Sequence, residues 1–406
     1  MSSIKERFVI PGRYKQWSLG LMGVGVLSLI IGFVMYGTHD QGTRFWAALL
    51  QNSVYFLLIT NAAMFFFCAV TLAMGGFVIA FRRVTEAISA SVIPIGIITF
   101  VILLCLVFGG KDTLYVWLNK DTVAHDVVLN GKKGFLNPTF FITWSILSIG
   151  LWTLLGYKMR SLSRSIDDTP LSVEEGKKYM FKNTVWSALY IVWFALTVAS
   201  VTPWLWLMSI DAHWFSTMYS WYTFASTFVS GVALMTLFII YLKNQGYLEY
   251  VNEEHLHDLG KFQFAFSIFW TYLWFAQFML IWYANISEET IYFKTRFEGA
   301  YVGLFYLNLV INFLAPLLIF MKRSSKRNYA TVTFMSVLLI FGHWLDFYQM
   351  VFAGPYPDHV PMNLFDFGVA LGFVGLIMWQ TARVLGKFPL LAKNHPFLKE
   401  SVIHHT

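Results

Sequence analysis

Long apolar stretches dominate this chain of 406 residues. A run of about 20 apolar residues is long enough to cross the hydrocarbon core of a bilayer as a helix. Within that core each backbone N–H and C=O must find its partner inside the segment, so the stretches are predicted to be helical. Ten spans are predicted, at Trp17 to Gly37, Ser53 to Ala80, Ala87 to Gly109, Asn137 to Tyr157, Val185 to Ser209, Phe215 to Leu242, Phe262 to Tyr283, Glu298 to Met321, Ala330 to Val351 and Asn363 to Arg383.

The basic residues between these spans are distributed unevenly. Of the 29 Lys and Arg residues, 22 fall in the N-terminal segment Met1 to Gln16, in alternate loops and in the C-terminal tail. Positively charged loops resist translocation, so both termini are predicted to be cytoplasmic. The net charge of +7 reflects this topology, and no basic patch has the pattern that nucleic-acid binding needs.

Composition predicts a single membrane domain over residues 1–406. The chain is 57% hydrophobic and 13% charged, and no loop is long enough to fold separately. The predicted fold is all-α, with two four-helix bundles formed by spans two to five (residues 53–209) and spans six to nine (210–351). Residues 1–52 and 352–406 supply the peripheral first and tenth spans. Both bundles start on the outer side, so a parallel duplication is one hypothesis.

Span nine carries the most informative polar residues. In the run FGHWLDFYQM, His343, Asp346 and Gln349 recur every three residues, which places His343 and Asp346 together on one helical face. An ionisable side chain inside hydrocarbon costs several kcal/mol unless it is paired or hydrated, so this pair is predicted to be functional.

Further ionisable residues are predicted near the outer ends of other spans. They are Asp211, His213, Glu298 and Asp366. Together with His343 and Asp346 they would form an outward-opening proton path or quinol-like site, because imidazole titrates near neutral pH. The alternative is that several acidic residues are simply hydrated at the interface, namely Asp211, Asp358, Asp366, Glu288 and Glu289.

Amide side chains form a second predicted set. Asn61, Gln277, Asn308 and Asn312 would form a polar strip across the bundle, which more often joins helices than binds ligands. No carboxylate lies in the inner half of any predicted span. A proton route from the cytoplasm would therefore need waters held by hydroxyl groups, at Thr71, Ser230, Thr236, Thr333 or Ser336.

The sequence offers no redox centre of its own. Two haems need four axial histidines, whereas only His343 is clearly within a predicted span. Cys68 and Cys105 lie in mid-span, where a thiol acts as apolar filler. No metal site, phosphate-binding loop or hydrolytic triad is predicted.

Two stretches are more specific than composition. They are SIDAHWFSTMYSWYTFASTFVSG, from Ser209 to Gly231, and WYANISEETIYF, from Trp282 to Phe293. Both resemble signatures of the F subunits of alternative complex III, which belong with the NrfD-like polysulfide-reductase membrane proteins. The resemblance extends over essentially the whole chain, although Ser287 stands where the family pattern would have proline.

The resemblance implies a cofactor-free subunit of a quinol:cytochrome c oxidoreductase in the bacterial inner membrane. It implies partners that hold the redox centres, namely an iron–sulfur subunit and multihaem and monohaem cytochromes c. It also implies a sister NrfD-like subunit that holds the better-supported quinol site, with a terminal oxidase as a further candidate partner. Menaquinol or ubiquinol and membrane lipids would be the small-molecule ligands. Three hypotheses follow: a supporting and proton-conducting subunit, a quinol-oxidising NrfD-like subunit of this or a molybdenum reductase complex, and a proton-coupled transporter.

Overall fold

The computed structural model describes residues 6–38 and 42–405 and is helical throughout, with no strand in those ranges. Ten helical segments are long and apolar enough to cross a membrane. They are Gly12–Tyr36, Thr43–Leu72, Arg82–Phe108, Pro138–Arg164, Val173–Ile210, Met218–Asn244, Glu253–Ala284, Val302–Phe320, Tyr329–Phe352 and Leu364–Leu385. The prediction of ten spans is confirmed, and these helices indicate a multi-pass membrane protein.

Seven spans are each a single helix. These are α1 (Gly12–Tyr36), α2 (Thr43–Leu72), α7 (Pro138–Arg164), α10 (Met218–Asn244), α11 (Glu253–Ala284), α16 (Tyr329–Phe352) and α17 (Leu364–Leu385). The third span consists of α3 (Arg82–Ser89) and α4 (Val92–Phe108). Short helices occupy the connections: η2 (Gly76–Ala80), η3 (Val116–Leu118), α5 (Lys120–His125), α6 (Val127–Lys132), α12 (Ser287–Phe297), α15 (Arg323–Arg327) and α18 (Leu398–Val402).

The fifth and eighth spans are interrupted by a π turn. Helix α8 (Val173–Leu196) continues through η4 (Thr197–Val201), α9 (Thr202–Trp206) and η5 (Met208–Ile210). In the eighth span, α13 (Val302–Leu309) passes through η6 (Val310–Leu314) into α14 (Ala315–Phe320). Each π turn is followed at once by a helix with proline in its first turn, and proline cannot donate the backbone bond that would close a regular turn.

Several predicted boundaries are wrong. Span two was expected at Ser53 to Ala80, but α2 covers Thr43–Leu72, and Ala80 ends the separate helix η2. Spans five and seven were expected to begin at Val185 and Phe262, but α8 begins at Val173 and α11 at Glu253, because polar residues continue both helices beyond the apolar run. Span eight was expected to begin at Glu298, but α13 begins at Val302, and Glu298 is the residue that ends α12. A polar N-cap sets the start of the tenth span. Asn363 caps the start of α17 and Asp366 bonds back to the Asn363 backbone, so this carboxylate helps to define the helix start.

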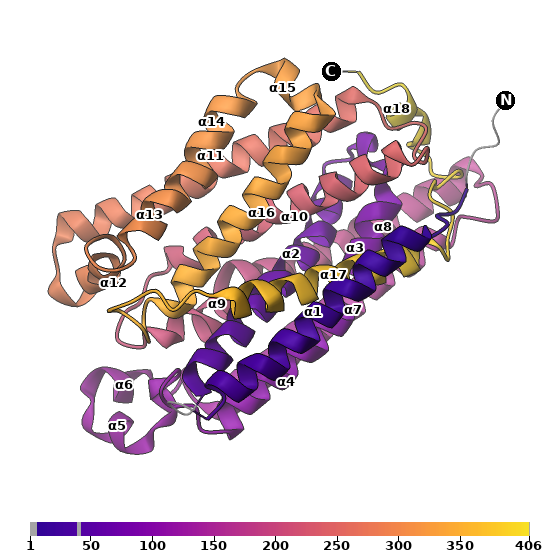
Figure 1. Ribbon diagram of the computed structural model, residues 1–406. Coiled ribbons are helices and arrows are strands. Elements are labelled where there is room, and N and C mark those ends of the chain that lie inside the picture. Colours follow the sequence, from indigo (N-terminus) through magenta and orange to yellow (C-terminus); the bar gives the residue numbers. More distant parts are fainter. Residues whose placement is uncertain (1–5, 39–41, 406) are drawn as a thin grey trace.

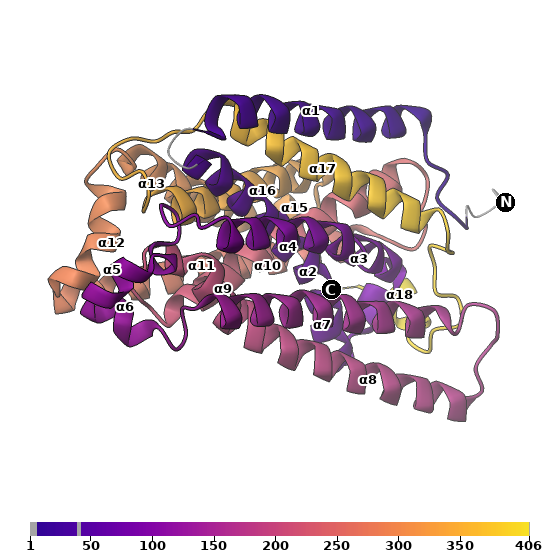
Figure 2. The ribbon, with the colours of Figure 1, turned by 90° about the horizontal axis from the view of Figure 1, so that it is seen from below.

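Helices α2 and α10 form the centre of the molecule. They pack against each other, and 83% of the most apolar window of each is buried. Helix α2 also contacts α4, α8, α16 and α17, whereas α10 contacts α11 and α16. At the periphery, α1 packs along α17 on one edge of the bundle, and α8 lies along the opposite edge (Figure 2).

Both ends of the described chain lie at one end of the bundle, which we call the terminal end (Figure 1). The backbone N–H of Leu390 donates to the Glu6 carbonyl at 2.8 Å, which holds the two terminal segments together. The opposite end, called the distal end, carries α5, α6 and α12 (Figure 1). Residues 1–5 of the predicted cytoplasmic segment Met1 to Gln16 lie outside the described residues.

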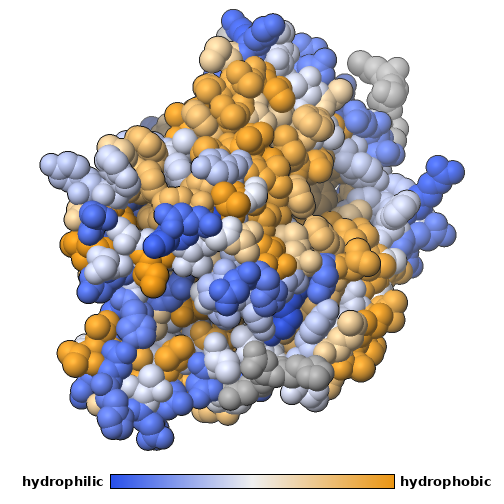
Figure 3. Space-filling view, turned by 60° about the vertical axis from the view of Figure 1, so that its left-hand side comes forward, coloured by the Kyte–Doolittle hydropathy of each residue, from blue (hydrophilic) through white to orange (hydrophobic). Residues whose placement is uncertain are grey.

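Much of the outer surface is hydrophobic. Figure 3 shows hydrophobic residues over much of one face, with hydrophilic residues gathered toward its top and lower left. Many large apolar side chains on the peripheral helices are more than half exposed, among them Val34, Val192 and Phe334. Lipid would cover such side chains in a membrane, whereas Asp346, His343 and the polar groups that bond to them are buried.

Candidate functional site

Asp346 occupies the centre of the candidate site. It lies on α16 about 9 Å from the distal end of that helix, at about 1.5 Å per residue, and is 3% exposed. Its Oδ1 accepts hydrogen bonds from Tyr222 and from Asn308 Nδ2 (3.3 Å), and its Oδ2 accepts from Trp270 Nε1 (3.1 Å) and Ser226 Oγ (3.2 Å). The donors to this carboxyl therefore come from three other helices.

Ser226 joins Asp346 to His343. The Ser226 hydroxyl lies 2.9 Å from His343 Nδ1 and 3.2 Å from Asp346 Oδ2, and His343 is fully buried. The Ser226 hydroxyl is therefore the hydrogen-bond partner that the two titratable groups share among the described residues. The prediction that His343 and Asp346 lie on one face is confirmed, but they meet through α10.

A hydroxyl in this position can transfer a proton in either direction. When His343 is an imidazolium, it donates through Nδ1–H to Ser226, and Ser226 donates to the Asp346 carboxylate. When Asp346 is protonated, it donates to Ser226, which donates to the unprotonated Nδ1. Exchange between the two arrangements moves one net proton from one residue to the other without moving either helix.

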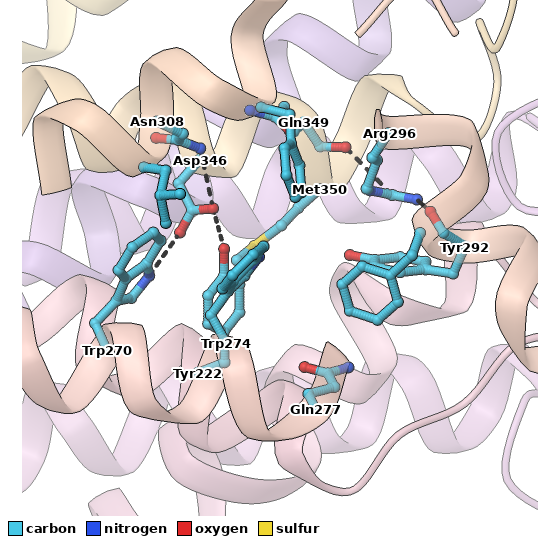
Figure 4. Close-up of a pocket in the computed structure, with 13 residues that line it drawn as sticks. Tyr222, Trp270, Trp274, Gln277, Tyr292, Arg296, Asn308, Asp346, Gln349 and Met350 are labelled. Carbon is cyan, nitrogen blue, oxygen red and sulfur yellow. Dashed lines mark hydrogen bonds between the residues drawn. The ribbon is translucent and has the colours of Figure 1, made fainter. Parts of the chain in front are cut away.

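A small cavity lies beside Asp346. It has a volume of about 30 Å³ and is lined from α10, α11, α12, α13 and α16 (Figure 4). Gln277 and Gln349 line it, and neither amide nitrogen has a partner among the described residues. Buried amide donors are normally hydrogen-bonded, and a cavity of this size has room for one or a few waters. The cavity is thus suited to hydrate one side of Asp346.

Arg296 separates this cavity from a wider hollow at the distal end. The hollow has a volume of about 340 Å³ and shares Tyr292 and Arg296 with the inner cavity as a common wall. Arg296 is 5% exposed and donates to Asp211 (3.1 Å) and to the Gln349 carbonyl (3.3 Å). The guanidinium also lies over the Tyr292 ring, 3.4 Å from its centroid, which holds it in place.

The wider hollow contains further titratable groups. Asp211 and His213 both line it, and His213 Nε2 lies 2.6 Å from Asp126. This hydrogen bond lowers the pKa of Asp126. Asp346, Arg296, Asp211 and His213 therefore follow one another from the interior toward the distal surface.

The structure separates the remaining predicted ionisable residues from this line. Asp366 is fully buried and pairs with Arg44 of α2 at 2.5 Å, so it joins α17 to α2. Glu298 is exposed at the surface and lies 3.8 Å from Lys294. The single cluster expected from the sequence is therefore wrong for Asp366 and Glu298, because the tertiary packing gives each a different partner.

The predicted strip of amides is present only in part. Asn312 donates to Asn308 at 2.8 Å, and Asn308 continues to Asp346, so these two belong to the site. Asn312 lies in the π turn η6, which widens the helix at this point. Asn61 instead accepts a hydrogen bond from Tyr190, and no described hydrogen bond joins Asn61 to the other amides.

Hydroxyl groups also meet in the terminal half of the bundle. Gln263 of α11 donates to Thr236 (3.0 Å) and to Ser336 (3.1 Å), and it is fully buried. Ser336 lies two turns from His343 on the same face of α16, about 10 Å away along the helix. Thr236 and Ser336, two of the hydroxyls expected to hold waters on an inner route, are therefore linked through the Gln263 amide.

Sequence reasoning missed several residues of the site. The most important are Tyr222, Ser226, Trp270, Arg296 and Gln263. Tyr222 and Ser226 are one turn apart on one face of span six, so this spacing was an available signal. Nothing in the local sequence indicated that Trp270 or Arg296 would face Asp346. Searches against protein families and against curated proteins found no family and no curated protein that matches this chain.

Proposed function

We propose that this chain is a proton-conducting membrane subunit in which Asp346 and His343 exchange a proton through Ser226. The observation that carries the proposal is a buried carboxyl that accepts four hydrogen bonds, shares a hydroxyl with a histidine and lies beside a cavity of water size. A carboxyl at this depth is costly to maintain, which favours a functional role over a structural one.

The direction of transfer follows from the arrangement of polar groups. On the distal side of Asp346 lie the hydrated cavity, Arg296 and the wider hollow with Asp211. On the terminal side lies the Gln263 group, which is neutral and fully buried. Protons would therefore leave Asp346 toward the distal end, with Arg296 as the group that closes the exit while it is paired with Asp211.

The biological setting that we propose is a respiratory quinol:cytochrome c oxidoreductase of a bacterial inner membrane. The support is the resemblance of Ser209 to Gly231 and Trp282 to Phe293 to the F subunits of alternative complex III. In this setting the terminal end faces the cytoplasm, and iron–sulfur and cytochrome c partners dock at the distal end. Helices α2, α4, α7 and α8, and helices α10, α11, α13 and α16, would be the two bundles.

A second candidate function is quinol binding beside Asp346. Its support is the aromatic lining of the cavity, which includes Tyr222, Trp270 and Trp274. Small-molecule sites usually enclose about 300–1,000 Å³, whereas this cavity has about 30 Å³. Quinol binding would require α11 and α13 to move apart, so the geometry favours proton transfer.

Proton flux in vesicles tests the proposal directly. The full chain is reconstituted into phospholipid vesicles that contain a pH-sensitive dye, and a potassium diffusion potential drives protons inward. We expect Asp346→Asn and His343→Ala to lower the flux at least tenfold. Asp358→Asn is the matched control, because Asp358 is an exposed aspartate outside the site and its substitution should leave the flux unchanged.

Purification tests the proposed setting separately. A tag on this chain should isolate a complex that contains c-type haem, visible in the reduced spectrum, and quinol:cytochrome c activity. Proton flux that is equal in wild type and Asp346→Asn would contradict proton conduction by the site. A chain that conducts protons but isolates without haem partners would contradict only the respiratory setting.

A further inference from the structure

A second hollow lies on the opposite side of α2 from the α10 and α16 site. It has a volume of about 520 Å³, lies between α1, α2, α4 and α17, and shares no residue with the Asp346 cavity. Its floor consists of buried apolar side chains, at Phe45, Leu49, Ile102 and Phe373. Its rim consists of side chains that are about half exposed, at Val26 (57%), Phe33 (55%) and Val101 (51%). A buried floor with an exposed rim describes a groove that opens sideways.

The groove exists because α1 packs mainly against α17. A Cβ on Gly25 would lie 2.5 Å from the Gly372 Cα, so the α1 and α17 backbones touch at that point. Small residues allow such close approach between membrane helices. Helix α1 packs chiefly on α17 and only weakly on α2, which leaves the hollow between α1 and α4.

The groove has the length of one membrane leaflet. On α1 it extends from Met22 to Phe33, which is about 16 Å of helix at about 1.5 Å per residue. A hydrocarbon core of about 30 Å gives about 15 Å for each leaflet. Phe33 lies near the distal end of α1, and Phe45 and Trp46 lie in the first turn of α2, so the groove runs from the distal interface to the bilayer centre.

The width and chemistry of the groove identify the class of occupant. A volume of 520 Å³ open to the centres of water-sized spheres over about 16 Å, widened by about 1.4 Å at each wall, corresponds to a groove ~9 Å wide, whereas an α-helix with its side chains needs about 10–12 Å. A quinone head group would need polar partners for its carbonyls, and the lining offers only the Cys105 thiol and the Trp46 indole. A single flexible hydrocarbon chain fits both constraints.

We infer that this groove binds one acyl chain of a phospholipid from the distal leaflet. A basic residue lies where the head group would be: the Lys111 Cε is 3.5 Å from the position of a Cβ on Gly109, at the end of α4 just beyond Cys105. The ammonium group can reach a phosphate from there. The lipid fills the space between α1 and α4 and so fixes the outer pair of helices to the bundle.

Native mass spectrometry of the full-length chain tests the inference. The protein is purified in mild detergent and the phospholipids that remain bound are counted and identified by mass. Val101→Trp places an indole across the rim and should lower the bound phospholipid several-fold. Val192→Trp is the matched control, because Val192 is similarly exposed (58%) on α8, outside the groove, and its substitution should leave the count unchanged.

A fluorescence measurement supplies an independent test. The difference in emission between wild type and Trp46→Phe isolates Trp46, which lines the groove. After exchange into detergent with brominated phosphatidylcholine and removal of excess lipid, this difference should be strongly quenched. Equal phospholipid counts in the two Val→Trp variants, a bound quinone mass in place of phospholipid, or an unquenched Trp46 would each overturn the inference.

Discussion

Replacing Ser226 with alanine separates the two functions of the site, proton transfer and support of the fold. The change removes one hydroxyl and leaves the backbone and the other donors to Asp346 in place. Asp346 keeps its bonds from Tyr222, Trp270 and Asn308, whereas His343 Nδ1 loses its contact. At about 0.5–1.5 kcal/mol for each net hydrogen bond, we expect a loss of about 2 kcal/mol in the free energy of unfolding.

The effect on proton transfer should be much larger than the effect on stability. Among the described residues, Ser226 is the one whose hydroxyl hydrogen-bonds to both His343 and Asp346. Trp270 also contacts both, but its indole N–H only donates to Asp346 and its ring packs edge-on against His343, so without Ser226 the proton has no carrier between them. A positioned proton carrier typically contributes about 10²–10⁴-fold to a rate, so we expect the vesicle proton flux to fall by about 100-fold or more. The double variant Ser226→Ala/Asp346→Asn should be no slower than Asp346→Asn alone, because both changes interrupt one path.

Ser230→Ala is the matched control for this prediction. Ser230 lies one turn away on α10, is fully buried and donates to the Ser226 backbone carbonyl at 3.0 Å. Its loss removes one hydrogen bond, which costs about 0.5–1.5 kcal/mol in the free energy of unfolding, and it leaves the Ser226 hydroxyl in place, so proton exchange between His343 and Asp346 should stay intact. A Ser226→Ala protein that conducts at the wild-type rate, while Asp346→Asn does not, would refute the hydroxyl as the carrier.

Three further predictions concern stability. Arg44→Ala leaves the buried Asp366 carboxyl without its ion pair, and an unpaired buried charge typically costs about 3–5 kcal/mol, so the thermal midpoint of unfolding should fall by many degrees. Lys294→Ala removes an exposed ion pair and should change this midpoint little. Gly25→Ala should lower the free energy of unfolding by about 1–3 kcal/mol because its Cβ would overlap Gly372, whereas a Cβ at Gly23 on the same helix meets nothing within 4 Å. Equal thermal midpoints for Gly25→Ala and Gly23→Ala would argue against the close contact of α1 with α17. Burial lowers the pKa of His395 to about 2, so below about pH 6.5 the unfolded chain binds a proton that the folded chain does not. The free energy of unfolding should therefore fall by about 1.4 kcal/mol per pH unit as the pH drops below 6.5, and His395→Asn should make the thermal midpoint less dependent on pH over that range.

Local sequence predicts the spans because the bilayer imposes a simple local rule. Every stretch of about 20 apolar residues must satisfy its own backbone, so length and hydropathy are enough to place a helix. The prediction failed at the ends of several spans. Polar residues continue α8 back to Val173 and α11 back to Glu253, and a short separate helix precedes span eight at Glu298. A polar helix at the interface obeys no such rule, and its boundary depends on what it packs against.

Local sequence also predicts which polar residue is unusual, but not which partner it has. The spacing of His343 and Asp346 within one helix was sufficient to place them on one face. Asp366 was predicted near the outer end of span ten, where hydration was one alternative, yet it is fully buried and pairs with Arg44, which is 322 positions earlier in the chain. Pairing between distant helices depends on how the bundle closes, and no periodicity within one span carries that information.

The sequence by itself determined that the chain has ten helices long and apolar enough to cross a membrane, and that span nine carries an acid and a histidine on one face, because hydrophobic length and helical periodicity act within one segment. Only the tertiary structure decided that Ser226 lies between those two groups, that Arg296 borders both cavities, and that α1 stands away from α4. Each of these depends on contacts between helices, whose free energy comes from packing and interhelical hydrogen bonds that are defined only when the helices are brought together.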